Sequence, residues 1–181
     1  MDMHPYNSRF FAAAISRYFY KPVDKVVSNL ERFLLLLCSL AILLAMVITA
    51  IDVVLRYGFS EQLGWTFDFV MLYLLPAAYY LAFSYALKNG AHLSVDFFVD
   101  KLPALLTKMV YPVILVIGAA LFFYIAYLMA EQAYASFKGG ETLFGSISWL
   151  TWPTGAIMSA SFFVFSVRLV LNACREAFLK G

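Results

Sequence analysis

The chain has 181 residues, of which 64% are hydrophobic and only 13% are charged, and its formal net charge is +2. Its mean hydropathy is +0.82, and ordinary globular domains are only about 45–50% apolar. This composition excludes a separate soluble domain, and the small net charge does not indicate a strongly acidic or basic partner.

The amino-terminal segment, residues 1–32, predicts an amphipathic arm. Phe11, Ile15, Tyr18 and Phe19 recur at helical spacing beside several basic residues. Helices with this pattern lie in the plane of a membrane interface. The alternative is a disordered tail, but the density of aromatic residues favours an arm on the cytoplasmic surface.

Four stretches without Asp, Glu, Lys or Arg follow, at residues 33–51, 69–87, 110–130 and 142–167. At about 1.5 Å per residue the shortest covers roughly 28 Å, close to a bilayer core of about 30 Å. The first stretch is longer than the apolar part of a signal peptide and is preceded by 32 residues, so we interpret it as a retained span. We therefore expect an all-α membrane protein, a single membrane domain over residues 1–181, with spans at about 33–57, 62–87, 104–134 and 152–172.

The first two spans are joined by a short outer turn. Asp52 and Arg56 are four residues apart and share one helix face, and Gly58 is a plausible end of the helix. Asp68 lies at a similar depth on the other side of the turn, and we predict that it pairs with Arg56. Pro76 predicts a kink in the second span.

The stretch KNGAHLSVDFF, residues 88–98, separates the second and third spans. Gly90 allows the chain to turn, and Ser94 can cap a new helix. Apolar residues at 95, 98, 99 and 102 then form one stripe. The pattern predicts a short interfacial helix on the cytoplasmic side. In contrast, residues 138–146, KGGETLFGS, predict a flexible outer loop before the last span.

The basic residues predict the topology. Eleven of the thirteen lie in the two terminal segments or between the second and third spans, and only Arg56 and Lys138 lie in the other two loops. The positive-inside rule then places both termini in the cytoplasm. All three tryptophans (Trp65, Trp149 and Trp152) fall at the opposite face, as expected for an aromatic belt.

No feature of the sequence indicates a reaction centre. The chain has two histidines, His4 and His92, and neither lies inside a span, whereas a haem in a helix bundle or a zinc site needs several inward ligands. Cys38 and Cys174 form no C-x-x-C motif, and we interpret them as small apolar residues. The middles of the spans hold no charge and no glycine-interrupted break. We therefore expect no catalytic residue, no metal, no cofactor and no substrate-binding residue.

Several local patterns, taken in order, resemble the small membrane subunit of tripartite ATP-independent periplasmic (TRAP) transporters. They are DVVLRYGF at 52–59, WTFD at 65–68 where the family usually has W-x-x-E, NGAHLSVD at 89–96 where it has G-x-H-I-x-V-D, and the Pro-x-Gly at 153–155. The length and the four spans are similar as well. The resemblance implies structural or partner-interface roles for Asp52, Arg56, Trp65, Asp68, Gly90, His92, Asp96, Pro153 and Gly155.

The resemblance also implies partners. In that family a periplasmic binding protein delivers an organic acid to a large membrane subunit, which performs sodium-coupled, elevator-type transport. The small subunit packs directly and obligately against the large one and widens its fixed scaffold. For this chain the resemblance implies a place in a bacterial inner membrane, with anionic lipid at the cytoplasmic face and no nucleic acid partner.

Two other functions are compatible with four apolar helices. One is a redox membrane subunit that anchors a haem or reacts with a quinone, which the missing C-x-x-C and the missing intramembrane histidine argue against. The other is a small carrier that works alone, which the uncharged span middles argue against.

Overall fold

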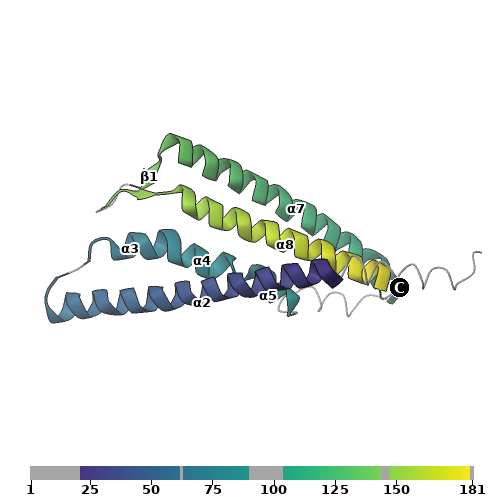
Figure 1. The fold of residues 1–181 in the computed structure, drawn as a ribbon, viewed down its shortest axis with the longest axis horizontal. Coiled ribbons are helices and arrows are strands. Elements are labelled where there is room, and N and C mark those ends of the chain that lie inside the picture. The colour runs from purple at the N-terminus through teal and green to yellow at the C-terminus, as the bar shows by residue number, and fades with distance from the viewer. Residues whose placement is uncertain (1–20, 62, 90–103, 144–146, 180–181) are drawn as a thin grey trace, which may run out of the picture.

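The computed structural model describes residues 21–61, 63–89, 104–143 and 147–179 (Figure 1). Long helical segments run back and forth along one axis. In chain order the elements are α2 (Lys21–Gly58), α3 (Thr66–Phe69), the π-helix η2 (Val70–Leu74), α4 (Leu75–Tyr80), α5 (Phe83–Lys88), α7 (Ala104–Gly139), β1 (Thr142–Leu143), β2 (Trp149–Leu150) and α8 (Trp152–Leu179).

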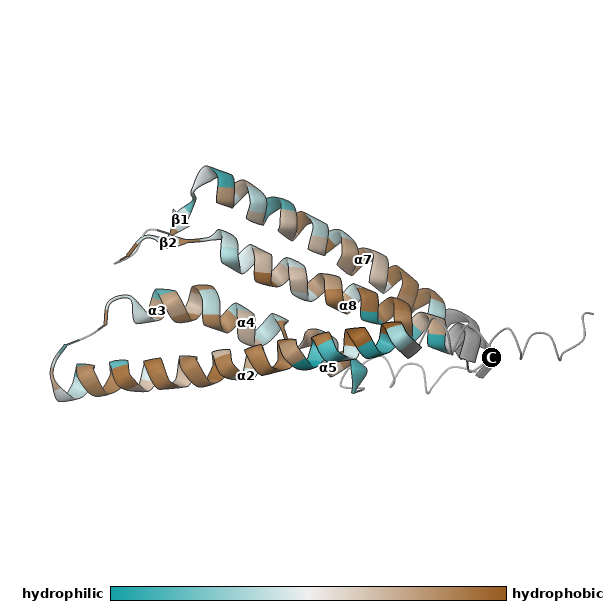
Figure 2. Cartoon of the chain, in the orientation of Figure 1, coloured by the Kyte–Doolittle hydropathy of each residue, from teal (hydrophilic) through white to brown (hydrophobic). Residues whose placement is uncertain are grey.

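Four helical stretches are long and apolar enough to cross a membrane, which confirms the predicted fold class. They cover Pro22–Gly58, Thr66–Lys88, Pro112–Gly139 and Trp152–Arg175. Figure 2 shows the apolar residues running along most of each stretch. The predicted amino-terminal arm, up to residue 20, and the predicted interfacial helix at 94–102 lie outside the described residues.

The chain enters and leaves the bundle at one end. α2 begins and α8 ends on the same side of Figure 1, and α2 ends and α8 begins on the other. We call these the termini end and the hairpin end. Pro22 stands in the first turn of α2, where a residue without an N–H is tolerated. The helix then continues without a break to Gly58, where the sequence predicted its end.

The segment between α7 and α8 differs from the predicted flexible loop. β1 and β2 pair in antiparallel fashion, with Thr142 opposite Leu150 and Leu143 opposite Trp149. The phenol of Tyr73 in η2 donates a hydrogen bond to the Leu150 carbonyl at 2.6 Å. Two residues of the predicted loop, Thr142 and Leu143, therefore form a strand, whereas residues 144–146 lie outside the described part of the chain.

α8 is the central helix of the described bundle. Half of its most apolar window is buried inside the protein, compared with 17% for each of the other three spans. α8 contacts α2, η2, α4, α5 and α7, whereas α7 packs mainly against α8. The spans other than α8 therefore present most of their apolar surface to whatever surrounds the chain.

Small residues bring α7 and α8 together. Ala119, Ala126 and Ala133, spaced seven residues apart on α7, are all buried. Two α8 hydroxyls reach the α7 backbone, because Ser159 donates to the Ala126 carbonyl at 2.9 Å and Ser166 donates to the Ala119 carbonyl at 2.8 Å. In lipid, close packing and hydrogen bonds of this kind hold helices together.

The two helices lie close together at Gly155. A Cβ atom at this position would lie 3.0 Å from the Cβ of Ala133. We expect Gly155→Ala to push α8 away from α7 and to destabilise the chain by about 1–3 kcal/mol, as overpacking does. Thermal unfolding of the purified chain in detergent measures this loss.

Gly118→Ala is the matched control, because a Cβ there would meet only Leu169, at an ordinary 3.7 Å. The double variant Gly155→Ala/Ala133→Gly removes the clash and should regain most of the lost stability. Equal effects of Gly155→Ala and Gly118→Ala would contradict the close approach.

Candidate functional site

A group of buried and partly buried charged and polar side chains lies at the termini end, where three helical segments meet. We call it the charged cluster, and its members are Asp24, Ser28 and Glu31 of α2, Ser84 and Lys88 of α5, and Arg168 of α8. The side chain of Glu31 is fully buried, and that of Arg168 is 6% exposed. Such groups are costly inside a membrane protein unless they are paired.

Arg168 joins α8 to two acids on α2. Its Nη1 donates to Asp24 Oδ1 at 2.5 Å, and its Nε lies 3.4 Å from Glu31 Oε1. The second contact is an ion pair without hydrogen-bond geometry. One guanidinium therefore bridges two turns of α2, which fixes the axial position of α8 against the first helix.

α5 completes the charged cluster from the other side. The Ser84 hydroxyl donates to Glu31 Oε1 at 2.6 Å, and Lys88 Nζ donates to Ser28 at 2.8 Å. Lys88 Nζ also lies 3.9 Å from Glu31 Oε2. Two cations face two acids, so the charged cluster as a whole is neutral and can be buried.

Sequence reasoning missed the charged cluster. It counted Arg168 among the basic residues of the carboxy-terminal segment, whereas the structure buries the side chain of Arg168. A signal was available, because Arg168 ends the longest uncharged stretch, residues 142–167, and an arginine always carries its charge. Asp24 and Glu31 are acids at the same end of the predicted bundle. Only Arg32 separates Glu31 from the first uncharged stretch.

Asp52 organises the hairpin end. The predicted pair with Arg56 is present, with Arg56 Nη2 2.7 Å from Asp52 Oδ2. The other oxygen of Asp52 accepts a hydrogen bond at 2.9 Å from the Leu63 amide, which lies beyond the turn. Asp52 is itself buried. It therefore ties the end of α2 to the chain that leads into α3.

The predicted pair between Arg56 and Asp68 was wrong. Among the described ion pairs, Arg56 contacts Asp52, and Asp68 contributes none. Asp68 lies in the first turn of α3, which begins at Thr66 and so starts later than the residue 62 expected from the sequence. There its charge complements the helix dipole.

An aromatic group covers the hairpin end. Trp65 contacts Phe69 edge to face at 6.0 Å between ring centroids, and Phe69 contacts Tyr73 and Trp149 at 5.6 and 5.4 Å. Tyr73 and Trp149 also meet, at 5.8 Å. These rings link the start of the second span to β2, as an interfacial aromatic belt would.

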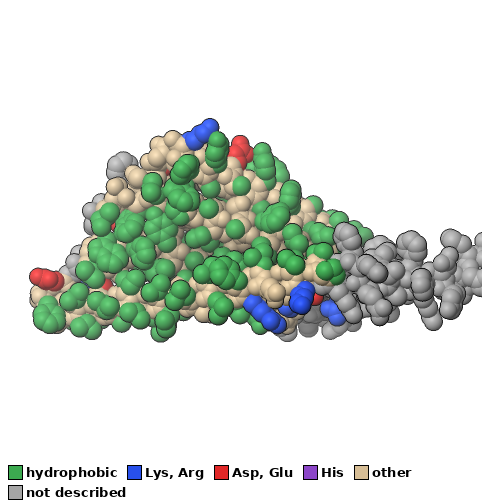
Figure 3. Space-filling view, in the orientation of Figure 1, with side chains coloured by type: hydrophobic (Ala, Val, Ile, Leu, Met, Phe, Trp, Pro, Cys, Tyr) green, Lys and Arg blue, Asp and Glu red, His purple; other side chains and the backbone are tan. Residues whose placement is uncertain are grey.

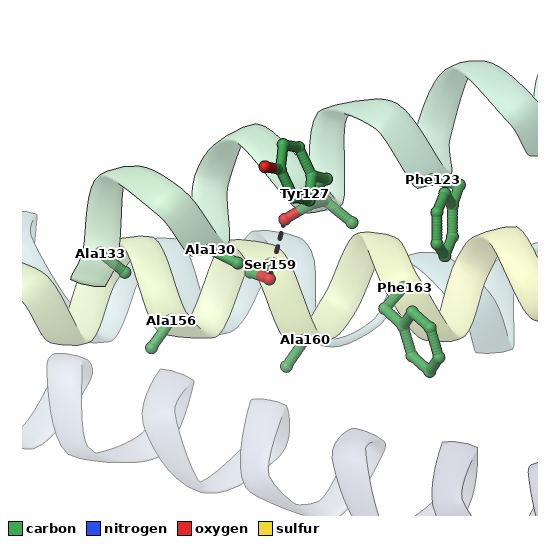
Figure 4. Close-up of a pocket in the computed structure, with 9 residues that line it drawn as sticks. Phe123, Tyr127, Ala130, Ala133, Ala156, Ser159, Ala160 and Phe163 are labelled. Carbon is green, nitrogen blue, oxygen red and sulfur yellow. Dashed lines mark hydrogen bonds between the residues drawn. The ribbon is translucent and has the colours of Figure 1, made fainter. Parts of the chain in front are cut away.

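An open groove runs along α7 and α8 (Figure 4). Its volume is about 470 Å³. Alanines form its floor, and Phe123, Tyr127 and Phe163 stand beside it. The Ser159 hydroxyl, which points toward the groove, donates to the Ala126 carbonyl. The groove has no charged lining residue, so it suits an apolar chain or helix and not a carboxylate.

The remaining predicted site residues fall into two groups. Pro153 lies in the first turn of α8, and Gly155 lies against α7. Gly90, His92 and Asp96 lie outside the described residues. Within the described part of the chain, no group of three or more His, Cys, Asp or Glu side chains could hold a metal ion.

The charged cluster predicts a specific pattern of stabilities. Arg168→Met should destabilise the chain by about 3–5 kcal/mol, because it leaves the buried carboxylate of Glu31 without its nearer cation. Arg175→Met on the exposed part of the same helix is the control and should have little effect. Thermal unfolding in detergent compares the two.

The double variant Arg168→Met/Glu31→Gln separates charge from packing. Removing the opposed charge should restore part of the stability lost in Arg168→Met, since removing both charges of a buried pair costs less than leaving one of them unpaired. If the stability loss of the double variant equals or exceeds the sum of the losses of the two single variants, Arg168 and Glu31 do not act as a pair.

Asp52 and Asp68 form a second matched comparison. Asp52→Asn should destabilise the hairpin end by about 1–3 kcal/mol, because a buried acceptor of two hydrogen bonds loses its charge. Asp68→Asn, which breaks no described ion pair, should cost less than 1 kcal/mol. Hydrogen exchange at the Leu63 amide should rise in Asp52→Asn alone; equal protection in both variants would contradict this role.

Comparison with known proteins identifies the family. The family model described as "Tripartite ATP-independent periplasmic transporters, DctQ component" matches residues 45–179, which is well over half of the chain. That match covers part of α2 and all of the later spans. No curated protein and no solved structure matches the chain. The chain belongs to the family of DctQ components, the small membrane subunits of tripartite ATP-independent periplasmic transporters.

Proposed function

We propose that this chain is a scaffold for the large membrane subunit of its transporter. In this proposal a periplasmic binding protein delivers an organic acid, such as a C4-dicarboxylate, a sialic acid or another carboxylate. The large subunit carries the acid inward with sodium. The small subunit packs against the large one and binds no solute itself.

The position of the charges is the observation that carries the proposal. On α2, Glu31 and Asp52 are about six turns apart, roughly 30 Å along the axis. Arg168 joins Glu31 at one end, and Arg56 joins Asp52 at the other. Residues 33–51 of α2, 69–87 of the second span, 112–130 of α7 and 152–167 of α8 include no Asp, Glu, Lys or Arg. A carboxylate inside a span needs donors or cations to replace its water, so the solute must bind elsewhere.

The exposed apolar faces support the scaffold role. α2 leaves large side chains such as Leu36, Leu43 and Met46 more than half exposed along its length. Figure 3 shows hydrophobic side chains over most of the visible face, with a group of Lys and Arg side chains beside the beginning of α2. A helix bundle with one central helix and broad apolar sides can join a larger membrane protein without rearranging its own core.

The basic residues support a cytoplasmic position for the termini end. Lys25, Arg32 and Arg175 are exposed there, whereas the described hairpin end carries Arg56 and Lys138. By the positive-inside rule, both termini of the chain lie on the cytoplasmic side of a bacterial inner membrane. The exposed cations would then lie near anionic lipid headgroups, and each would contribute about 1 kcal/mol to membrane binding.

Reconstitution tests the scaffold role. Liposomes containing the large subunit and this chain should take up the acid from the loaded binding protein when a sodium gradient is applied. Liposomes with the large subunit alone, or with this chain alone, should show no uptake. In cells, deletion of the chain should abolish uptake, and supplying it separately should restore uptake.

Calorimetry completes the test. The purified chain should give no saturable heat with C4-dicarboxylates, sialic acids or related carboxylates. Saturable binding to the isolated chain would favour a carrier that works alone, and normal uptake without the chain would overturn the scaffold role.

A further inference from the structure

The second span is not one continuous α-helix. It consists of α3, the π-helix η2, α4 and α5, with Leu81 and Ala82 between the last two. π-helical turns and prolines are common causes of bends in helices. Here both occur within residues 69–87, a stretch of the span that contains no Asp, Glu, Lys or Arg.

Pro76 causes the first irregularity, and α8 compensates for it. Proline has no N–H, so it cannot donate to the carbonyl four residues earlier, which is that of Leu72. In this structure the Thr154 hydroxyl of α8 donates to the Leu72 carbonyl at 2.6 Å. A side chain from a neighbouring helix thus replaces the bond that proline removes, as backbone in lipid requires.

The second irregularity lies one turn further on, and α2 compensates for it. α4 ends at Tyr80 and α5 begins at Phe83. In a continuous helix the Ala82 amide would donate to the Ala78 carbonyl. The buried thiol of Cys38 on α2 donates to that carbonyl at 3.1 Å. A thiol is a weak donor, so this contact is the weaker of the two.

The parts of the span on either side are held differently. α5 is fixed in the charged cluster by Ser84 and Lys88. The outer part, α3 and η2, is joined instead to β2, through the hydrogen bond of Tyr73 to Leu150 and the ring contacts of Phe69 with Trp149. Any motion at the joint would therefore move α3, η2 and the β1–β2 pair together, and would leave α5 in place.

We propose that the second span is a jointed helix, with Thr154 as the main latch and Cys38 as the minor one. The joint lies between η2 and α5. In the latched state Thr154 holds the Leu72 carbonyl and fixes the tilt of the outer part against α8. When the latch opens, the outer part and the β1–β2 pair tilt as a unit at the hairpin end.

Fluorine NMR can detect this motion, because the chain has only three tryptophans and they lie at the hairpin end. Trp65 reports on α3 and lies well away from Thr154 in sequence. The full chain is labelled with fluorotryptophan in detergent, and single Trp→Phe variants assign the signals. Wild type should show one Trp65 resonance.

Thr154→Val keeps the shape of the side chain and removes its donor. It should shift the ratio of open to latched chains by roughly fivefold, the effect of one hydrogen bond, and so produce a second Trp65 resonance. Thr49→Val is the matched control, because the Thr49 hydroxyl bonds only within α2, to Ala45 at 2.7 Å, and is exposed. An unchanged Trp65 signal in Thr154→Val would overturn the proposal.

Two further variants separate a latch from simple packing. Pro76→Ala restores the missing N–H, so Pro76→Ala/Thr154→Val should again show a single Trp65 resonance. Thr154→Ser keeps the hydroxyl and should resemble wild type, and it remains informative if Thr154→Val fails to fold. A second resonance that persists in the double variant, or that appears in Thr154→Ser, would show that Thr154 acts by packing and would overturn the latch.

Discussion

Arg168 carries a permanent positive charge inside the apolar helix α8, and the arrangement of the bundle follows from how that charge is neutralised. Its partners, Asp24 and Glu31, lie on α2, and Glu31 is shared with α5. The guanidinium can therefore be buried only if α2, α5 and α8 meet at one end in one register. The same requirement recurs at the opposite end, where Asp52 is buried and takes both a cation and a backbone amide.

The bonds between helices follow one rule. Side-chain hydroxyls and a thiol on one helix donate hydrogen bonds to backbone carbonyls of a neighbouring helix. Ser159 and Ser166 reach carbonyls of α7, Thr154 reaches a carbonyl of η2, and Cys38 reaches one of α4. Because lipid offers no competing donors or acceptors, these few contacts define how the helices pack, while large apolar side chains on the outer faces stay exposed.

Features set by local sequence could be predicted, and features set by tertiary contacts could not. The four long helices, the end of α2 at Gly58 and the pair of Asp52 with Arg56 follow from patterns within one helix. The partners of Arg168 depend on which helices become neighbours. The false pair of Arg56 with Asp68 shows the limit, because equal depth does not tell which acid faces the arginine. The family itself could be inferred from short motifs in the correct order, although three of their residues (Gly90, His92 and Asp96) lie outside the described structure.

The position of α8 in the chain has a consequence for how the protein is made. Glu31 leaves the ribosome early, and Arg168 follows only after most of the chain, a delay on the order of ten seconds at usual rates of synthesis. During this interval α2 and the second span are in the membrane without the helix that neutralises their acids and caps the Leu72 carbonyl. The bundle is therefore completed by its last helix, and until α8 is made, Glu31 and the Leu72 carbonyl lack the partners that α8 supplies.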